Sequence, residues 1–467
     1  MTGRAFIIDL SSLGMANVFG KLLWALSLAI AMRLLGPDAY GQLVVIWSVA
    51  GILAPLTDLG LSSLLLREGA RSPVTVGSLS RWAFAIRLVL GTMVVGLLAL
   101  GVIPLSVSLP ASVIVLAALG PVVDGLFLTI TAIAQVEQRV RLLAAWRIIG
   151  MATLPLLLLA ASDALTVSGA AAAWVIASAG AMIGFFSTRA FRGKELINDT
   201  KVAILPALRS SLPFLLLGAA SMSYGKLEVV VLGQVAGSRE AALYHSAYQL
   251  ILLAFSCADI LFTVLNAHLF RARANPQVLA ARWPPISRLL CTITALSAPV
   301  LWWNALPIMT LIGGPDFARA AEPLRALVPM LLVLPMAAAL HFLVLLDRPI
   351  ERAAFDTSCV VLTAILGLWS ARWGAAGMAW TASGVYVSTC LAAWLRARQL
   401  GIELEWISNY VKVLLAAIAA AWLFWLPLPW FVSTVLYPTI VMAILLGTRF
   451  LKMVDFSKLA PSIEGDV

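Results

Sequence analysis

The sequence has few of the residues that cover soluble domains, and few that hold metals or form disulfides. Only 12% of its 467 residues are charged, whereas soluble domains are usually about 25% charged. Its four cysteines and three histidines occur in no CxxC or HExxH arrangement, which removes the common redox, zinc and disulfide motifs. We therefore expect no metal, no cofactor and no disulfide framework.

Long apolar runs take the place of the missing charges. Hydrophobic residues make up 62% of the chain, and about 20 of them in one helix cross a hydrocarbon core of about 30 Å. The sequence thus predicts an all-α integral membrane protein with about 14 transmembrane helices. The predicted spans are 10–34, 42–66, 82–104, 112–136, 143–162, 167–188, 212–235, 241–267, 288–312, 325–346, 354–371, 374–395, 411–427 and 430–448.

The positions of lysine and arginine predict the orientation. With the N-terminus inside, most of the 32 cations fall on one side of the membrane, among them Arg139, Arg141 and Arg147. This bias is the one that cytoplasmic loops show. Both termini are therefore expected in the cytoplasm, no removable signal peptide is expected, and the net charge of +10 requires no nucleic-acid partner.

The longest cytoplasmic connection divides the chain. Its mixed charges and spaced apolar residues favour a helix on the membrane surface. The predicted parts are a six-helix lobe at 1–190, an amphipathic linker at 191–211, a second six-helix lobe at 212–398, and a helix pair with a tail at 399–467. Loops on the opposite side are short, so no soluble domain is expected on either face.

Two anchors indicate that the lobes repeat each other. At an offset of 201 residues, Gly36 aligns with Gly237 and Asp58 aligns with Asp259. Paired repeats are common in transporters, whose binding sites lie at the repeat interface.

Ionisable residues inside the spans are the candidate functional residues, because a charge at the bilayer centre costs roughly 2.5–3.5 kcal/mol on insertion scales. Lys226 and Glu228 interrupt the apolar run "SYGKLEVVVLG". They are two positions apart, about 200° around a helix, so they do not pair with each other. Lys226 either lines a cavity or forms an ion pair with another span. Glu228 is either a coupling acid or a structural partner.

Three further polar residues are candidates for a cavity. Lys21 is the first-lobe cation expected to face Lys226, and Asn17 precedes it by one turn. Arg87 is also a cavity candidate. For Lys21 and Arg87 the alternative is snorkelling, in which the charged end reaches interfacial water.

Three aspartates are candidates for ion coupling or gating. Asp124 lies at the centre of its span and is flanked by glycine and proline. A carboxylate there suits proton exchange. The alternative is that Asp124 forms an ion pair with Lys21 or Arg87. Asp58 and Asp259 lie in the inner third of their spans, as packing, gating or coupling residues. Tryptophans near span ends suit interfacial belts better than sugar stacking; examples are Trp302, Trp303, Trp422, Trp425 and Trp430.

Residues 33–71, "RLLGPDAYGQLVVIWSVAGILAPLTDLGLSSLLLREGAR", resemble the N-terminal signature of bacterial polysaccharide-export flippases. These belong to the superfamily that also holds multidrug and toxic-compound extruders. The matching elements are Arg33 to Pro37, Tyr40–Gly41, Asp58 to Gly60, and Arg67–Glu68. Residues 237–250 look like the start of the second lobe. The entry motif of peptidoglycan-precursor flippases is not evident.

The resemblance implies two lobes facing each other across a cavity, with alternating access coupled to an ion gradient. It implies a cargo of oligosaccharide on a polyprenyl-pyrophosphate lipid, moved to the periplasmic leaflet of the inner membrane for exopolysaccharide or O-antigen synthesis. Implied partners are membrane lipids and the polymerase and chain-length proteins of the pathway. The alternative is a multidrug/cation antiporter of the same superfamily. Because the outside loops are short, we expect a transporter and not a membrane-bound enzyme.

Overall fold

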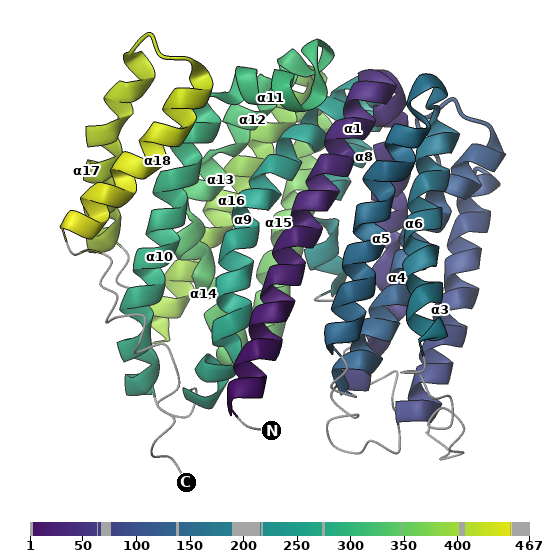
Figure 1. Ribbon diagram of the computed structural model, residues 1–467, viewed down its shortest axis with the longest axis horizontal. Coiled ribbons are helices and arrows are strands. Elements are labelled where there is room, and N and C mark those ends of the chain that lie inside the picture. The colour runs from purple at the N-terminus through teal and green to yellow at the C-terminus, as the bar shows by residue number, and fades with distance from the viewer. Residues whose placement is uncertain are drawn as a thin grey trace. The chain divides into compact units, whose positions relative to one another are not determined.

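The computed structural model describes residues 3–62, 64–66, 76–136, 140–188, 215, 218–272, 276–346, 348–400, 407–448 and 450. Within these ranges the side chains at 3–18, 76, 78, 140, 141, 164, 260, 263–272 and 276–282 are not described. All regular secondary structure in the described part is helical (Figure 1). The chain forms two compact units, Met1–His245 and Ser246–Val467.

The first unit consists of long helices and the start of α9. Their bounds are α1 Gly3–Asp58, α3 Val76–Ala99, α4 Ala111–Val136, α5 Val140–Ala160, α6 Val167–Ser187, α8 Lys226–Val235 and α9 Ser238–Ala272. Helix α1 contacts α3, α4, α5, α6 and α8, so it is the element on which the other helices of this unit pack. The boundary between the units falls inside α9, and the linker predicted at 191–211 lies outside the described residues. The predicted division into lobes stays a prediction.

The second unit continues with α9 and holds the remaining helices. These are α10 Pro276–Trp303, α11 Ala305–Gly313, α12 Ala321–Leu327, α13 Pro329–Leu332, α14 Leu334–Leu345, α15 Pro349–Ser370, α16 Gly374–Gln399, α17 Ile407–Ala421 and α18 Trp430–Gly447. Helices α17 and α18 form a pair beside α10 (Figure 1). The Tyr437 hydroxyl of α18 donates a hydrogen bond of 3.0 Å to the Ala295 carbonyl of α10, which ties this pair to the unit.

Ten of the described helical stretches are long and apolar enough to cross a membrane, or eleven if the bent pair Pro315–Leu332 and Leu334–Leu345 is one span. Two of the ten have double length, Phe19–Asp58 with 40 residues and Pro349–Gln399 with 51. The first is broken at Gly36 and the second at Ala371–Trp373, where the sequence predicts span ends. The all-helical membrane class is confirmed, and the count of 14 stays a prediction.

The span predicted over 212–235 is not one continuous helix. Residues 218–223 are helical, Tyr224 and Gly225 form a turn, and α8 begins at Lys226. Gly225 has φ 72°, a left-handed conformation that glycine adopts at little cost. A lone glycine in an apolar run does not by itself predict a break, so the sequence analysis missed it. The break makes Lys226 the first residue of a helix.

The two glycines of the proposed repeat both have a positive φ. Gly36 has φ 70° and Gly237 has φ 94°, and a helical segment follows each of them. The two segments approach closely: the Tyr40 hydroxyl lies 3.0 Å from Nδ1 of His245, and both rings are buried. Gly41 faces the carbonyl of Ser238 so closely that a Cβ there would lie 2.0 Å from its oxygen.

We expect Gly41→Ala to lower the free energy of unfolding by about 1–3 kcal/mol. The new Cβ would clash with the backbone carbonyl of Ser238, which cannot move away by a change of rotamer. The measurement is thermal unfolding of the purified protein in detergent. Gly96→Ala in α3 is the matched control, since a Cβ there meets nothing within 4 Å and alanine favours a helix over glycine. An unfolding temperature of the Gly41→Ala protein equal to that of the wild type would contradict this packing.

Candidate functional site

The first unit contains a cavity of about 720 Å³. Its walls come from α1, α3, α4, α5 and α6, together with Gly60, Ser62, Leu66, Leu215, Gly218, Met222 and Lys226. The ionisable side chains on its walls are Lys21, Asp58, Arg87, Asp124, Arg147 and Lys226. Apart from Arg147, each of these is a candidate from the sequence. The structure therefore gathers charges from separate spans at one place.

Arg87 and Asp58 form an ion pair at one wall of this cavity. Arg87 is 2% exposed, and its guanidinium contacts the Asp58 carboxylate. It also donates to the Gly125 carbonyl and, at 2.7 Å, to Oγ1 of Thr129. Arg87 thus joins α1, α3 and α4 instead of extending toward interfacial water. Asp58 additionally accepts hydrogen bonds from the backbone N–H and the hydroxyl of Ser62, at 3.2 and 2.7 Å.

Asp124 is held by neutral donors on α6. The indole N–H of Trp174 donates at 3.0 Å and the hydroxyl of Ser178 at 2.7 Å. Arg147 of α5 interacts with the same carboxylate electrostatically. These three are the partners that the described structure shows for Asp124, where the sequence offered Lys21 or Arg87. A carboxylate with two neutral donors and one cation nearby can change its protonation state without losing every contact.

Three tryptophans form a cluster on the cavity wall beside Asp124. Trp47 meets Trp174 edge to face with ring centroids 4.0 Å apart, and Trp24 lies 5.1 Å from Trp174 and 6.4 Å from Trp47. All three line the cavity. The sequence analysis missed this cluster, because tryptophans in apolar runs carry no signal that distinguishes a cavity wall from an interfacial belt.

Lys226 and Lys21 lie on the walls of the same cavity. The aliphatic end of Lys226 covers Gly51 of α1, where a Cβ would lie 2.8 Å from Cε and 3.0 Å from Nζ. Glycine at position 51 therefore provides the space that the Lys226 side chain occupies. Lys226 is also the first residue of α8, where the backbone N–H groups add positive charge to that of the ammonium.

The remaining candidates lie elsewhere. Glu228 is 6% exposed and is not among the residues that line the cavity. Its carboxylate accepts from the backbone N–H groups of Gly225 and of Glu228 itself, the position from which an acid caps a helix start. Asp259 is exposed on α9 in the second unit. The side chain of Asn17 lies outside the described residues.

Arg147 was assigned by the sequence to the cytoplasmic side as an orientation signal, and its role in the cavity was missed. It lies in the second turn of α5, four residues inside the predicted span at 143–162, and lines the cavity. The position of Arg147 inside an apolar run was the signal in the sequence that could have indicated a place in the cavity. Among the described residues, no group of three His, Cys, Asp or Glu could hold a metal ion.

A helical membrane protein with ionisable side chains around an internal cavity has the architecture of a transporter for polar cargo. Residues 8–265 match the sequence profile of the family described as "Polysaccharide biosynthesis protein". This match covers more than half of the chain, and the chain belongs to that family. The resemblance of residues 33–71 to polysaccharide-export flippases is thereby confirmed.

Solved structures of transporters have a similar fold. The lipid II flippase MurJ in an inward closed conformation matches with a TM-score of 0.69 at 14% identity, over 95% of this chain and 99% of that chain. An inward-facing multidrug resistance MATE family transporter of the MOP superfamily matches with a TM-score of 0.69 at 15% identity, over 81% of this chain and 94% of that one.

A MOP superfamily transporter from Pyrococcus furiosus matches with a TM-score of 0.63 at 13% identity, over 84% of this chain and 95% of that chain. At these identities the likeness shows the fold. No curated protein sequence matches the chain.

We expect Arg87→Met to destabilise the protein by about 3–5 kcal/mol, because it leaves the Asp58 carboxylate without its cation in a low-dielectric site. The double variant Arg87→Met/Asp58→Asn is expected to regain most of the loss, since it removes both charges. Thermal unfolding in detergent measures both. Equal destabilisation in the single and double variants would show that the ion pair is not what stabilises this wall.

Proposed function

We propose that this protein is a flippase for a lipid-linked oligosaccharide repeat unit carried on polyprenyl pyrophosphate. The cargo moves from the cytoplasmic to the periplasmic leaflet of the bacterial inner membrane, where exopolysaccharide or O-antigen is assembled. Membership of the polysaccharide biosynthesis family supports the pathway. The fold shared with a lipid II flippase supports the type of transport.

The charge balance of the cavity is the observation that carries this proposal. Its described lining has the cations Lys21, Arg87, Arg147 and Lys226 against the carboxylates Asp58 and Asp124. Both carboxylates already accept contacts from protein groups. The cavity therefore has a surplus of positive charge, which suits a pyrophosphate better than a cationic cargo.

Lys226 and Lys21 are the cations that bind the pyrophosphate. Lys226 is the first residue of α8, so its ammonium and the positively polarised N-terminus of that helix both attract an anion. Within the described residues its Nζ lies 4.0 Å from the sulfur of Met222, a contact that does not neutralise the charge. Arg87 is held in the cavity wall by its ion pair with Asp58. Asn17 is the remaining substrate-binding residue proposed from the sequence.

The tryptophan cluster binds the sugars of the cargo. Aromatic faces stack on the apolar faces of sugar rings, and the indole N–H of Trp174 is already directed at Asp124. This assignment applies to Trp24, Trp47 and Trp174 alone. Exposed tryptophans such as Trp422 and Trp425, at 53% and 82%, keep the interfacial role expected from the sequence.

Asp124 is the first candidate for coupling transport to an ion gradient. If Asp124 takes up a proton, Arg147 loses its balancing charge and becomes a stronger site for the anionic cargo. Asp58, Glu228 and Asp259 are the further candidates for coupling or gating. Asp58 is fixed by Arg87, and Glu228 caps α8, so both serve first in positioning helices.

The protein is proposed to lie in the inner membrane with both termini in the cytoplasm. Its partners are membrane lipids and the polymerase and chain-length proteins of the pathway. These assignments rest on the distribution of lysine and arginine and on the family resemblance.

The second candidate function is a multidrug/cation antiporter. The observation in its favour is the carboxylate of Asp124 beside three tryptophans, because aromatic rings and an acid together bind organic cations. The fold shared with a MATE family transporter agrees with it. The engagement of Asp124 by Trp174, Ser178 and Arg147 counts against it.

We expect Lys226→Ala to lower flipping by about 30-fold or more, the equivalent of about 2 kcal/mol for a lost charged contact. Lys226→Arg should keep part of the activity because it keeps the charge. Gly51→Ala should also lower flipping, since the new methyl group displaces the Lys226 side chain without removing its charge. The measurement is cytoplasm-facing lipid-linked sugar in cells that depend on the variant, with Gly96→Ala as the glycine control. Full activity of Lys226→Ala at normal expression would remove Lys226 from the mechanism.

Overexpression in cells exposed to cationic dyes separates the two functions. A flippase is expected to leave dye resistance unchanged and to relieve accumulation of the lipid-linked sugar, with Asp124→Asn reducing that relief. An antiporter would raise dye resistance in an Asp124-dependent way, and Lys226→Ala would leave the resistance intact. That second result would replace the flippase proposal.

A further inference from the structure

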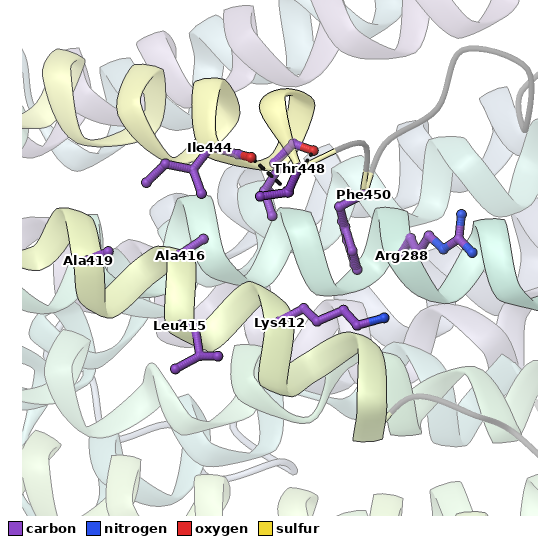
Figure 2. Close-up of a pocket in the computed structure, with 9 residues that line it drawn as sticks. Arg288, Lys412, Leu415, Ala416, Ala419, Ile444, Thr448 and Phe450 are labelled. Atoms are coloured by element: carbon purple, nitrogen blue, oxygen red, sulfur yellow. Dashed lines mark hydrogen bonds between the residues drawn. The ribbon is translucent and has the colours of Figure 1, made fainter.

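The second unit has a cavity of its own, a groove of about 770 Å³ between α10, α17 and α18. It is separate from the cavity that carries the proposed function, and nothing in that function uses it. Its lining residues are Arg288, Lys412, Leu415, Ala416, Ala419, Ile444, Leu445, Thr448 and Phe450 (Figure 2).

The chemistry of this groove changes along its length. Figure 2 shows Arg288, Lys412 and Phe450 toward one end, and Leu415, Ala416, Ala419 and Ile444 further along. The described lining contains two cations and no carboxylate. The groove is thus positively charged at its mouth and apolar beyond it.

The apolar wall on α17 is one continuous stripe. Lys412, Leu415, Ala416 and Ala419 follow the spacing i, i+3, i+4 and i+7, which places them on one face of a helix. Ala419 lies seven residues from Lys412, about 10 Å along the helix axis. Ala419 is exposed, and its small side chain leaves room for an acyl chain along α17.

The two cations lie toward the same end of the groove (Figure 2). Lys412 is five residues after Ile407, the first residue of α17, which is about 7.5 Å of helix. From that depth a long basic side chain reaches the headgroup region. Arg288 also packs its guanidinium over the ring of Phe450, with 5.9 Å to the centroid, so the mouth has an ordered wall.

We infer that this groove binds an anionic phospholipid of the surrounding bilayer, with its phosphate at Arg288 and Lys412 and one acyl chain along Leu415, Ala416 and Ala419. A basic mouth next to an apolar channel between transmembrane helices complements this class of lipid, and basic pockets at the cytoplasmic side of such helices bind anionic headgroups. The bilayer is the source because Lys412 is exposed and Leu415 is 63% exposed, so the groove opens to the lipid around it. The polyprenyl-phosphate carrier has the same phosphate chemistry and is the competing source.

The test uses the full-length protein in neutral detergent, titrated with phosphatidylglycerol or phosphatidylcholine, with bound lipid counted by native mass spectrometry. We expect phosphatidylglycerol to be retained preferentially. Lys412→Glu should lower its retention by at least about fivefold, given the usual contribution of one basic residue near an anionic lipid. Arg398→Glu is the matched control, because Arg398 is likewise exposed at the end of a helix in this unit and lies outside the groove.

Ala419→Leu tests the chain-binding part separately, because it fills the apolar groove and leaves both cations in place. It should lower phosphatidylglycerol retention, while inorganic phosphate alone should give none of the thermal stabilisation that the lipid gives. Equal retention of the two lipids, or an equal loss in the Arg398→Glu control, would overturn the inference. Displacement of phosphatidylglycerol by an equimolar amount of polyprenyl phosphate would assign the groove to the carrier and overturn the bilayer source.

Discussion

The cost of an unpaired charge away from water governs the structure of the first unit. Arg87 is almost fully buried, and it is stabilised there by the Asp58 carboxylate, the Gly125 carbonyl and the Thr129 hydroxyl. These partners come from different helices, so satisfying one guanidinium fixes α1, α3 and α4 against each other. Asp124 fixes α4 to α6 in the same way. The pairs that make the buried charges tolerable therefore also build the cavity walls.

Glycine residues determine where the cavity cation Lys226 lies. In hydrocarbon a helix satisfies its own backbone groups, and irregular backbone is tolerated only where protein or a water-filled cavity surrounds it. Gly225 breaks the span next to the cavity, and α8 then begins with Lys226 on the cavity wall. Gly51 provides the space for that lysine. The position of this cation thus depends on two residues that have no side chain.

The sequence predicted the helical membrane class and the span ends at Gly36 and near Ala371. It also singled out five of the six ionisable residues that line the cavity, because the cost of a charge in an apolar run is local and can be read without knowing the neighbours. The roles of these residues in binding and coupling stay predictions. The contact partners of the charged residues were harder to predict. Nothing in the sequence pairs Arg87 with Asp58 or brings Trp24, Trp47 and Trp174 together, because these contacts depend on how separate helices pack. The turn at Tyr224–Gly225 was missed for a related reason, since a lone glycine has the same appearance in a continuous span and in a broken one.

The cavities of the two units differ in chemistry more than in size. The first, of about 720 Å³, carries both signs of charge and three indole rings, so it can discriminate among polar headgroups by contacts on several sides. The second, of about 770 Å³, has two cations and Phe450 at its mouth and mainly aliphatic side chains beyond them, so it offers one positively charged contact region and a length of apolar surface. A site of the first kind suits a cargo that must be recognised and released. A site of the second kind suits a lipid that stays bound, because its acyl chain remains in the hydrocarbon in either case and only the headgroup contact has to be supplied by the protein.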